Sequence, residues 1–292
     1  MVAIGANFVV AIAKLAAAVF TASTALAAEA AHALADTGNE GLLLLAQVRS
    51  RRPADARHVV GYGRDAYFWA LIASLGVFLA AAFFSVRVGI EALVNPPSET
   101  SFVVAYVVLA LSAVFDGVSL VTAVRQLRAE ARVFQRDFLD EIHVTSDPTI
   151  RAVFVEDAGA IVGDVVAFVG LLLHQITGSP TAEGIAAIVI GAVVATAAVQ
   201  LARRNRDFLL GEQASPATRA RIARYVLAEP GVVALRDLAV TFVGPHRVWV
   251  AARIDVDDSL TAPEVEALVR SLESGLKSES PFIARADIVP IG

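Results

Sequence analysis

Residues 67–84, YFWALIASLGVFLAAAFF, form a continuous run without a single charged side chain. A helix that crosses the hydrocarbon core of a bilayer needs about 20 mostly apolar residues. The run therefore predicts a membrane-spanning helix over about residues 67–93, and the remainder of the chain can be divided around it.

The overall composition agrees with a membrane protein. Of the 292 residues 57% are hydrophobic and 18% are charged, and the mean hydropathy is +0.65. Ordinary soluble domains carry roughly 25% charged residues, so the composition predicts several membrane spans. The net charge of −5 gives no reason to expect a nucleic-acid partner, since nucleic-acid binders are usually basic. The chain has no cysteine, which excludes disulfides, thiolate metal ligands and cysteine nucleophiles.

Five further segments are long and apolar enough to span a bilayer, which predicts an all-α transmembrane bundle of six helices. The first is interpreted as a helix rather than a signal peptide, because no basic region precedes it and no clear cleavage signal follows it. The five segments are residues 3–22, 26–48, 102–124, 152–174 and 182–202.

Arginine residues divide the loops into two classes. Cytoplasmic loops of membrane proteins are enriched in Lys and Arg. The loops around Ser23, at residues 95–101 and at residues 175–184 carry neither. The alternation predicts a multi-pass protein of the cell membrane, as in a bacterial inner membrane, with both termini in the cytoplasm. The basic residues of the other three regions are Arg49, Arg51, Arg52, Arg57 and Arg64; Arg125, Arg128, Arg132, Arg136 and Arg151; and Arg203, Arg204 and Arg206.

The composition changes at about residue 211, and no spanning run follows. Residues 217–229 form an amphipathic helical pattern, and residues 235–257 read as two strands around the turn VGPH. A helix is expected over residues 261–279 with Thr261 as its N-cap, followed by a last strand at 282–291. We therefore expect two domains, a transmembrane domain over residues 1–210 and a small cytoplasmic α+β domain of order α-β-β-α-β over residues 211–292.

The second predicted span contains the stretch EAAHALADTGNEGLLLL, residues 29–45. His32 and Asp36 are four residues apart, so they project from one helix face, and Asn39 continues that face. An imidazole and a carboxylate can form half of a Zn²⁺ site. The same pair can carry protons, or it can be a hydrogen-bonded pair that fixes helix packing. The spacing alone leaves these three interpretations open.

The fifth predicted span supplies carboxylates that could complete such a site. Glu156 and Asp157 are adjacent and point about 100° apart, so only one is expected to face a given neighbour. Asp164 lies on the same face as Asp157, two turns further on. Without a cation or protons these carboxylates would repel one another. A cation-binding site therefore explains the group better than packing does.

Other ionisable residues in the predicted spans have structural interpretations. Lys14 is expected to pair with a carboxylate on a neighbouring helix or to extend to the interface. Arg87 and Glu91 have the spacing of an ion pair within one helix. Glu29 lies close to a helix end and is expected to be hydrated, whereas the deeper Asp116 has no assigned role.

Three stretches in order resemble the cation diffusion facilitators, which are divalent-metal/proton antiporters, and in particular their zinc-transporter-nine-like branch. The stretches are KLAAAVFTASTALAAEAAHALADTGNEGLLLL (14–45), RSRRPADARHVVGYGRDAYFWA (49–70) and DPTIRAVFVEDAGAIVG (147–163). The resemblance covers nearly the whole chain and implies a homodimer that holds an ion between its second and fifth helices.

The resemblance also implies which side chains hold the ion. His32 and Asp36 match the family pattern on the second helix directly. On the fifth helix the pattern is HxxxD, and Val153 stands where the histidine is usual if Asp157 takes the aspartate position. The adjacent Glu156 is the expected substitute, with Asp164 as a further candidate. The implied metal ligands are His32, Asp36, Glu156 and Asp157.

The implied activity is export of a divalent cation in exchange for protons by alternating access, without a prosthetic group. Zn²⁺ is the expected ion, with Mn²⁺, Fe²⁺ and Co²⁺ as alternatives, because an oxygen-rich site favours harder ions. A loop histidine, His58, matches a position that binds zinc in some relatives, and it can equally be a surface residue. The tail has one histidine, His246, and strong metal binding is not expected there.

Two rival functions come from other classes. A metal-dependent membrane enzyme is disfavoured, because the chain has no HExxH motif, nucleophile elbow or phosphate loop. A non-transporting adaptor or metal sensor that retains the transporter fold is kept as the alternative, because Val153 departs from the ligand pattern.

Overall fold

The computed structural model describes residues 2–96, 101–133 and 145–291. The chain forms two compact units. One consists of Met1–Ala46 and Trp69–Asn205, and the other of Gln47–Phe68 and Arg206–Gly292. Arg136 and residues 97–100, on which part of the predicted loop pattern depends, lie outside the described residues.

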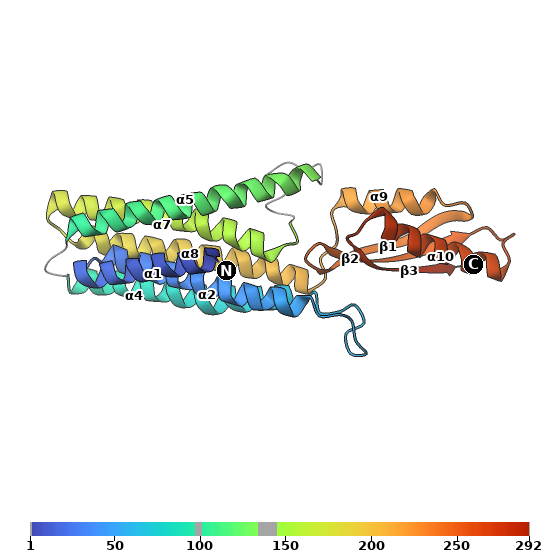
Figure 1. The fold of residues 1–292 in the computed structure, drawn as a ribbon, viewed down its shortest axis with the longest axis horizontal. Helices are drawn as coiled ribbons and strands as arrows, with labels where there is room; N and C mark the ends of the chain where they lie inside the picture. Colours follow the sequence, from blue (N-terminus) through green and yellow to red (C-terminus); the bar gives the residue numbers. More distant parts are fainter. Residues whose placement is uncertain (1, 97–100, 134–144, 292) are drawn as a thin grey trace. The chain divides into compact units, whose positions relative to one another are not determined.

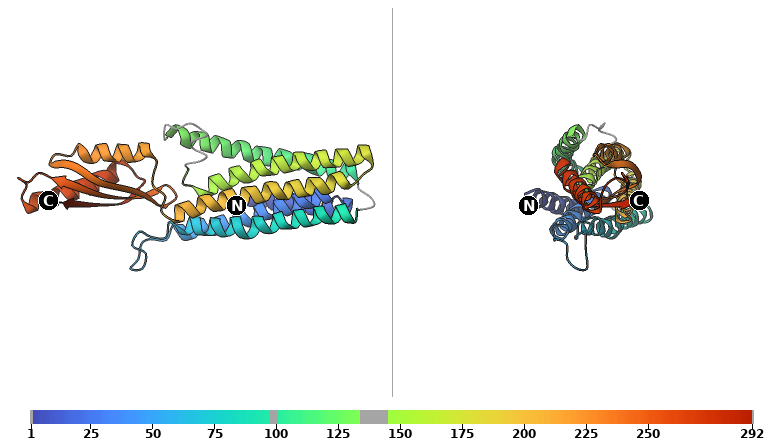
Figure 2. Two further views of the ribbon diagram at one scale, coloured as in Figure 1. Left: turned by 180° about the vertical axis from the view of Figure 1, so that it is seen from behind. Right: turned by 90° about the vertical axis from the view of Figure 1, so that its right-hand side faces the viewer.

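The first unit is made of long helices that run side by side (Figures 1 and 2). Four spans are long and apolar enough to cross a membrane: Asp65–Val94, Phe102–Arg132, Pro148–Thr177 and Thr181–Leu209. Asn7–Thr21 is a shorter apolar helix. The protein is therefore a multi-pass membrane protein, while the count of six crossings stays a prediction. The helices, some of which extend into the second unit, are α1 (Val2–Thr21), α2 (Thr24–Ser50), α3 (Asp65–Ala73), the π-helix η1 (Ser74–Phe78), α4 (Leu79–Val94), α5 (Phe102–Val133), α7 (Pro148–Thr177) and α8 (Thr181–Leu209).

Helix α7 shows why the helices exceed the apolar runs that predict them. Its N-cap Asp147 accepts hydrogen bonds from the backbone N–H groups of Thr149 at 2.8 Å and of Ile150 at 3.4 Å. Pro148 occupies the first turn, where no N–H donor is needed. Gly178 ends the helix with φ 70°, a conformation that glycine adopts without strain. These caps place Glu156 and Asp157 well inside a continuous helix.

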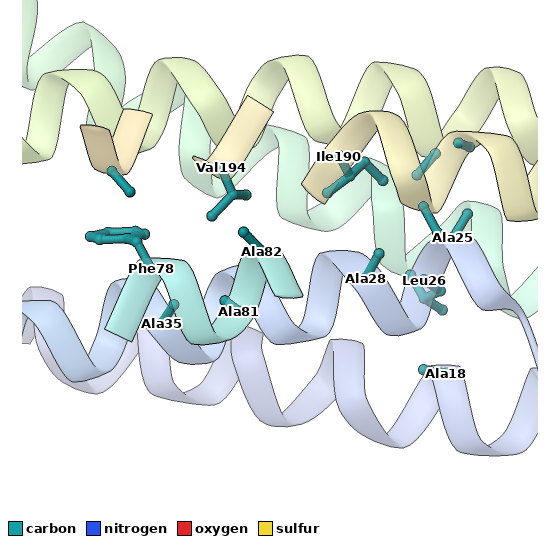
Figure 3. Close-up of a cluster of buried hydrophobic side chains, with 14 of the residues drawn as sticks. Ala18, Ala25, Leu26, Ala28, Ala35, Phe78, Ala81, Ala82, Ile190 and Val194 are labelled. Atoms are coloured by element: carbon teal, nitrogen blue, oxygen red, sulfur yellow. The ribbon is translucent and has the colours of Figure 1, made fainter. Parts of the chain in front are cut away.

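Small residues form much of the core of this unit. Figure 3 shows alanines from α1, α2 and α4 in one cluster of buried side chains with Phe78, Ile190 and Val194. Helices α4 and α8 approach so closely at Gly89 that a Cβ there would lie 2.6 Å from the carbonyl oxygen of Gly184. Small residues at a membrane helix interface allow such contact. The few long polar side chains therefore lie in a tightly packed apolar surrounding.

The second unit contains a three-stranded sheet in the order β1-β2-β3. Strands β1 and β2 are antiparallel and turn at His246, whose φ is 52°, whereas β2 and β3 are parallel. Thr261 caps α10 in a capping box with Glu264, which confirms the predicted N-cap. The elements along the chain are α9 (Pro216–Leu227), β1 (Val232–Gly244), β2 (Arg247–Val256), α10 (Ala262–Glu279) and β3 (Ile283–Ile291).

The loop of residues 47–68 packs within this second unit. Gly63 touches Val243 and Gly244 backbone to backbone, so that an added Cβ would overlap the Val243 carbonyl oxygen. The ring of Tyr67 stacks on Phe208 with centroids 4.9 Å apart. The loop after α2 is thus a structural part of the unit that holds the sheet.

Candidate functional site

Helices α2 and α7 meet along a seam of polar and small residues, and two contacts define it. The Asn39 amide on α2 donates a hydrogen bond to Glu156 Oε1 on α7. Further along, a Cβ added at Gly159 would lie 3.6 Å from His32 Cε1. Because numbering rises along one helix as it falls along the other, the helices are antiparallel, and the seam brings Asn39 and His32 of α2 against Glu156 and Gly159 of α7.

His32 and Asp36 lie on this seam as a loose pair. His32 Nε2 is 3.6 Å from Asp36 Oδ1, which is longer than a hydrogen bond. The His32 side chain is 3% exposed and that of Asp36 is 16% exposed. Neither His32 Nδ1 nor Asp36 Oδ1 has a hydrogen-bond partner among the described residues. Buried polar atoms are normally paired, so both atoms remain available to a cation or a proton.

Glu156 and Asp157 diverge, as their adjacency on a helix predicts. Glu156 faces α2, where Asn39 binds it. Asp157 faces α5 and accepts a hydrogen bond from the Ser119 side chain. Within the part of the chain that the structure describes, Asp157 Oδ2 has no partner and is therefore free to bind a cation.

Asp164 lies apart from these four side chains. Its carboxylate binds Lys14 Nζ at 3.0 Å, and Lys14 also binds Glu29 at 2.9 Å. The predicted pairing of Lys14 with a carboxylate on a neighbouring helix is confirmed. The predicted hydration of Glu29 is wrong, because its side chain is 0% exposed. A helix-end position in the sequence does not reveal that α1 and α7 cover this residue.

The four predicted ligands are not drawn into a closed metal site. Among the described residues, no group of three or more His, Asp or Glu side chains is close enough to hold one ion. Val153, one turn before Asp157, offers no ligand atom. His32 and Asp36 on α2 and Asp157 on α7 supply unpaired nitrogen and oxygen atoms, and binding one ion with all four residues requires these side chains to move together.

The loop histidine His58 has partners of its own. Its Nδ1 lies 3.4 Å from Asp55 Oδ1, and its ring lies 4.1 Å from that of Tyr62. The Tyr62 hydroxyl donates to Asp55 at 2.7 Å, and the His58 and Arg57 backbone N–H groups donate to the same carboxylate. These hydrogen bonds, the tyrosine bond first, lower the pKa of Asp55 to about 2. Asp55 therefore organises the loop around an exposed histidine.

In the tail, two carboxylates that could contribute ligands to a metal site beside His246 have partners of their own. Asp255 forms an ion pair with Arg236, and Asp257 accepts two hydrogen bonds from Ser259. His246 occupies the turn between β1 and β2. These carboxylates serve local structure in the second unit.

The sequence analysis did not single out the buried histidine His174, because this residue lies close to the end of its predicted helix. His174 Nδ1 on α7 is 2.5 Å from Glu183 Oε1 on α8, and Ser23 donates a hydrogen bond to the other oxygen of Glu183. The sequence contains a pattern that could have indicated this pair. His174 lies one turn before Gly178, which ends the helix, and Glu183 follows nine residues later in a loop without Lys or Arg.

The helical part of the chain matches a protein-family model, and this match identifies the family. A family model described as the cation efflux transmembrane domain matches residues 1–210. The chain belongs to the cation efflux family. This is a family of transporters rather than enzymes, and it agrees with the resemblance seen in the sequence.

Several members of the cation efflux family are similar over most of this chain. The human mitochondrial proton-coupled zinc antiporter SLC30A9 is 31% identical over 88% of the chain and 45% of its own length. Metal tolerance protein C4 of Arabidopsis thaliana is 28% identical over 82% of the chain and 52% of its own length. The metal cation efflux system protein CzcD of Cupriavidus metallidurans is 25% identical over 88% of the chain and 75% of its own length. The chain thus spans about half of the length of the first two relatives.

Proposed function

We propose that this protein exports a divalent metal ion in exchange for protons and binds the ion between α2 and α7. The observation that supports the proposal is a set of three buried ligand atoms without partners among the described residues, His32 Nδ1 and Asp36 Oδ1 on α2 and Asp157 Oδ2 on α7. Burying such atoms without partners is costly unless a cation or a proton satisfies them. Membership in the cation efflux family supports a metal cation as the transported substrate.

The proposed ligand set is His32, Asp36, Glu156 and Asp157. A nitrogen and three carboxylates suit a small divalent ion, and four ligands suit Zn²⁺. The relatives named as zinc antiporters support Zn²⁺ as cargo, with Mn²⁺, Fe²⁺ and Co²⁺ as competitors. Glu156 must exchange its hydrogen bond with Asn39 for the ion, which provides a step at which α2 and α7 can rearrange.

Proton exchange follows from the ligand chemistry. Imidazole and carboxylate groups bind metal only in their deprotonated forms, so the arrival of an ion displaces protons. Alternating access would then expose the seam to each side of the membrane in turn. The arginine distribution supports termini in the cytoplasm and a homodimer is implied by the family resemblance, so we propose export from the cytoplasm by a dimer.

A second candidate function is a membrane adaptor or metal sensor with the same fold. Two observations favour it, the absence of a ligand at Val153 and the engagement of Glu156 by Asn39. In this case the protein binds metal weakly or not at all, and its second unit is the functional part.

The test compares wild type with Asp36→Ala in proteoliposomes that contain a pH-sensitive dye and, in parallel, a metal-sensitive dye. Zn²⁺, Mn²⁺, Fe²⁺ and Co²⁺ are added in turn. We expect metal-dependent proton movement in wild type and in the control Glu91→Gln, whose carboxylate is exposed on α4, and none in Asp36→Ala. Metal uptake without proton movement would exclude exchange, and no uptake of any metal would favour the adaptor.

A further inference from the structure

A second polar cluster lies in the same unit, around the ammonium group of Lys14. Lys14 Nζ on α1 donates to Glu29 Oε2 on α2 at 2.9 Å and to Asp164 Oδ1 on α7 at 3.0 Å. Asp116 Oδ2 on α5 is 3.7 Å away. The side chains of Lys14, Glu29 and Asp164 are at most 4% exposed. The cluster therefore lies in the dry interior of the helical unit, where charges must balance.

The charges of this cluster do not balance without a proton. One ammonium faces two buried carboxylates, and the partly exposed Asp116 adds a third that Ser112 also binds. An uncompensated charge in a low-dielectric interior is strongly disfavoured. One bound proton makes the sum over Lys14, Glu29 and Asp164 zero.

The geometry offers a place for that proton. Glu29 Oε1 and Asp164 Oδ2 are buried and have no hydrogen-bond partner among the described residues. The two carboxyl groups bond to the same Lys14 Nζ, at 2.9 and 3.0 Å, and are therefore neighbours. Two carboxylates that share one site cannot both be ionised at low cost, so a proton between them satisfies both free oxygens. Gly163 makes room for this arrangement, because a Cβ there would overlap Glu29 Oε1.

The cluster continues the α2–α7 seam beyond the proposed metal ligands. Glu29 precedes His32 by three residues, and Asp164 follows Asp157 by seven. Besides its own members, the ionisable groups that face the cluster are His32 of α2 and Asp116 of α5. On the other two long helices of the unit, Arg87 and Glu91 of α4 pair with each other, and Glu183 of α8 is bound by His174.

We propose that Glu29 and Asp164, held by Lys14, form a proton-carrying site that is separate from the metal ligands. This inference rests on the proposed exchange function and deepens it. A divalent ion at His32 and Asp36 brings positive charge within one to two helical turns and drives off the shared proton. The carboxyl O–H bond breaks, and the proton passes to water. Reprotonation of the cluster favours metal release.

Lys14 makes this site specific for protons. Its ammonium fills the space between the carboxylates that a second metal ion would occupy. A metal ion could enter only by expelling a buried, doubly bonded cation. The cluster therefore takes up protons and not metal, although it consists of metal-binding side chains.

The test counts protons released per Zn²⁺ bound by the whole protein in detergent, with a pH indicator in weak buffer. The variants are Glu29→Gln and Asp164→Asn, which keep side-chain size and can still accept from Lys14, with Glu91→Gln as the exposed control. We expect each variant to release about one proton fewer than wild type and, because the coupling between proton and metal is reciprocal, to bind Zn²⁺ more weakly but still measurably. Unchanged proton release, or loss of Zn²⁺ binding in both variants, would overturn the inference.

A second readout separates this inference from the proposed function. Infrared difference spectra between acid and alkaline pH, recorded without metal, report protonation of buried carboxyl groups. Wild type and Glu91→Gln should show a carboxyl band that Glu29→Gln and Asp164→Asn both change. If wild type binds no metal, the proposed exchange function is wrong. The carboxyl band would still show whether Glu29 and Asp164 share a proton. A spectrum identical in all four proteins contradicts the shared proton.

Discussion

Two groups of carboxylates lie along α2 and α7, and they differ in what neutralises them. At the Lys14 cluster a cation from α1 is built into the protein and bonds to two carboxylates. At His32, Asp36 and Asp157 the described residues provide no such cation, and atoms of all three side chains lack partners. The carboxylates of the Lys14 cluster are thus neutralised by a permanent cation of the protein. Those at His32, Asp36 and Asp157 can be neutralised by a cation or proton that comes and goes.

The largest expected effect comes from removing the permanent cation. Lys14→Met leaves Glu29 and Asp164 buried without their partner, and breaking a buried ion pair in this way costs about 3–5 kcal/mol. Thermal unfolding in detergent should show a large loss of stability. The matched variant Asp36→Asn removes a carboxylate without an internal cation, so without metal it should be as stable as wild type or more stable. Equal destabilisation by both variants would show that the two groups of carboxylates do not differ in how they are neutralised.

Metal addition should sharpen the difference between the two groups. A ligand that binds only the folded protein stabilises it by about 2.7 kcal/mol at a hundredfold excess over Kd. We expect Zn²⁺ to raise the unfolding temperature of wild type and of Glu91→Gln but not that of Asp36→Asn. Removal of metal with a chelator should reverse the shift. A shift that persists in Asp36→Asn would place the ion elsewhere.

Two glycines of α7 provide a smaller and more local test. Gly163→Ala forces a methyl group into Glu29 Oε1, and overpacking of this kind costs typically 1–3 kcal/mol. Gly159→Ala places its methyl group 3.6 Å from His32 Cε1, an ordinary contact that the fold should tolerate. Unfolding measurements should separate the two variants. Comparable stability of both would mean that the Glu29 side chain has another position available.

The smallest expected effect concerns Asp55, an exposed carboxylate whose partners are hydrogen-bond donors. Its pKa of about 2 lies below the usual value, so its contribution to loop stability is complete above about pH 4 and is lost as the pH falls through about 2. Tyr62→Phe removes the largest cause and should raise this pKa towards its ordinary value. Carboxyl NMR titration measures the change. An unaltered titration would show that the backbone donors alone hold the carboxylate.

The sequence predicts the elements well because their signals are local. The apolar runs place both ends of α1, α2 and α7, the continuous stretch of α3, η1 and α4, and the starts of α5 and α8 to within a few residues. They miss the polar last turns of α5 and α8. Thr261 with Glu264 marks the start of α10. The divergence of Glu156 and Asp157 follows from the rotation of about 100° per helical residue. Such features need no knowledge of distant parts of the chain.

The arrangement of the polar groups could be predicted only in part, because it depends on which helices become neighbours. The sequence indicates that Lys14 needs a carboxylate, but the choice among Glu29, Asp116 and Asp164 requires α1, α2, α5 and α7 in place. Asp164 shares a helix face with Asp157 and still serves a different cluster. The spacing of residues along one helix shows on which face a side chain lies, but it does not show which residue of another helix that side chain will contact.

The packing of residues 47–68 against the sheet has a practical consequence for protein fragments. A tail fragment that begins at residue 211 lacks Gly63, Arg64 and Phe208. Phe208 meets the Phe242 ring edge-on at 5.2 Å, and Arg64 reaches the Phe242 carbonyl. Expressed alone, such a fragment exposes the end of its β1–β2 hairpin to solvent. Soluble versions of this unit are better designed with the loop residues attached than with the tail alone.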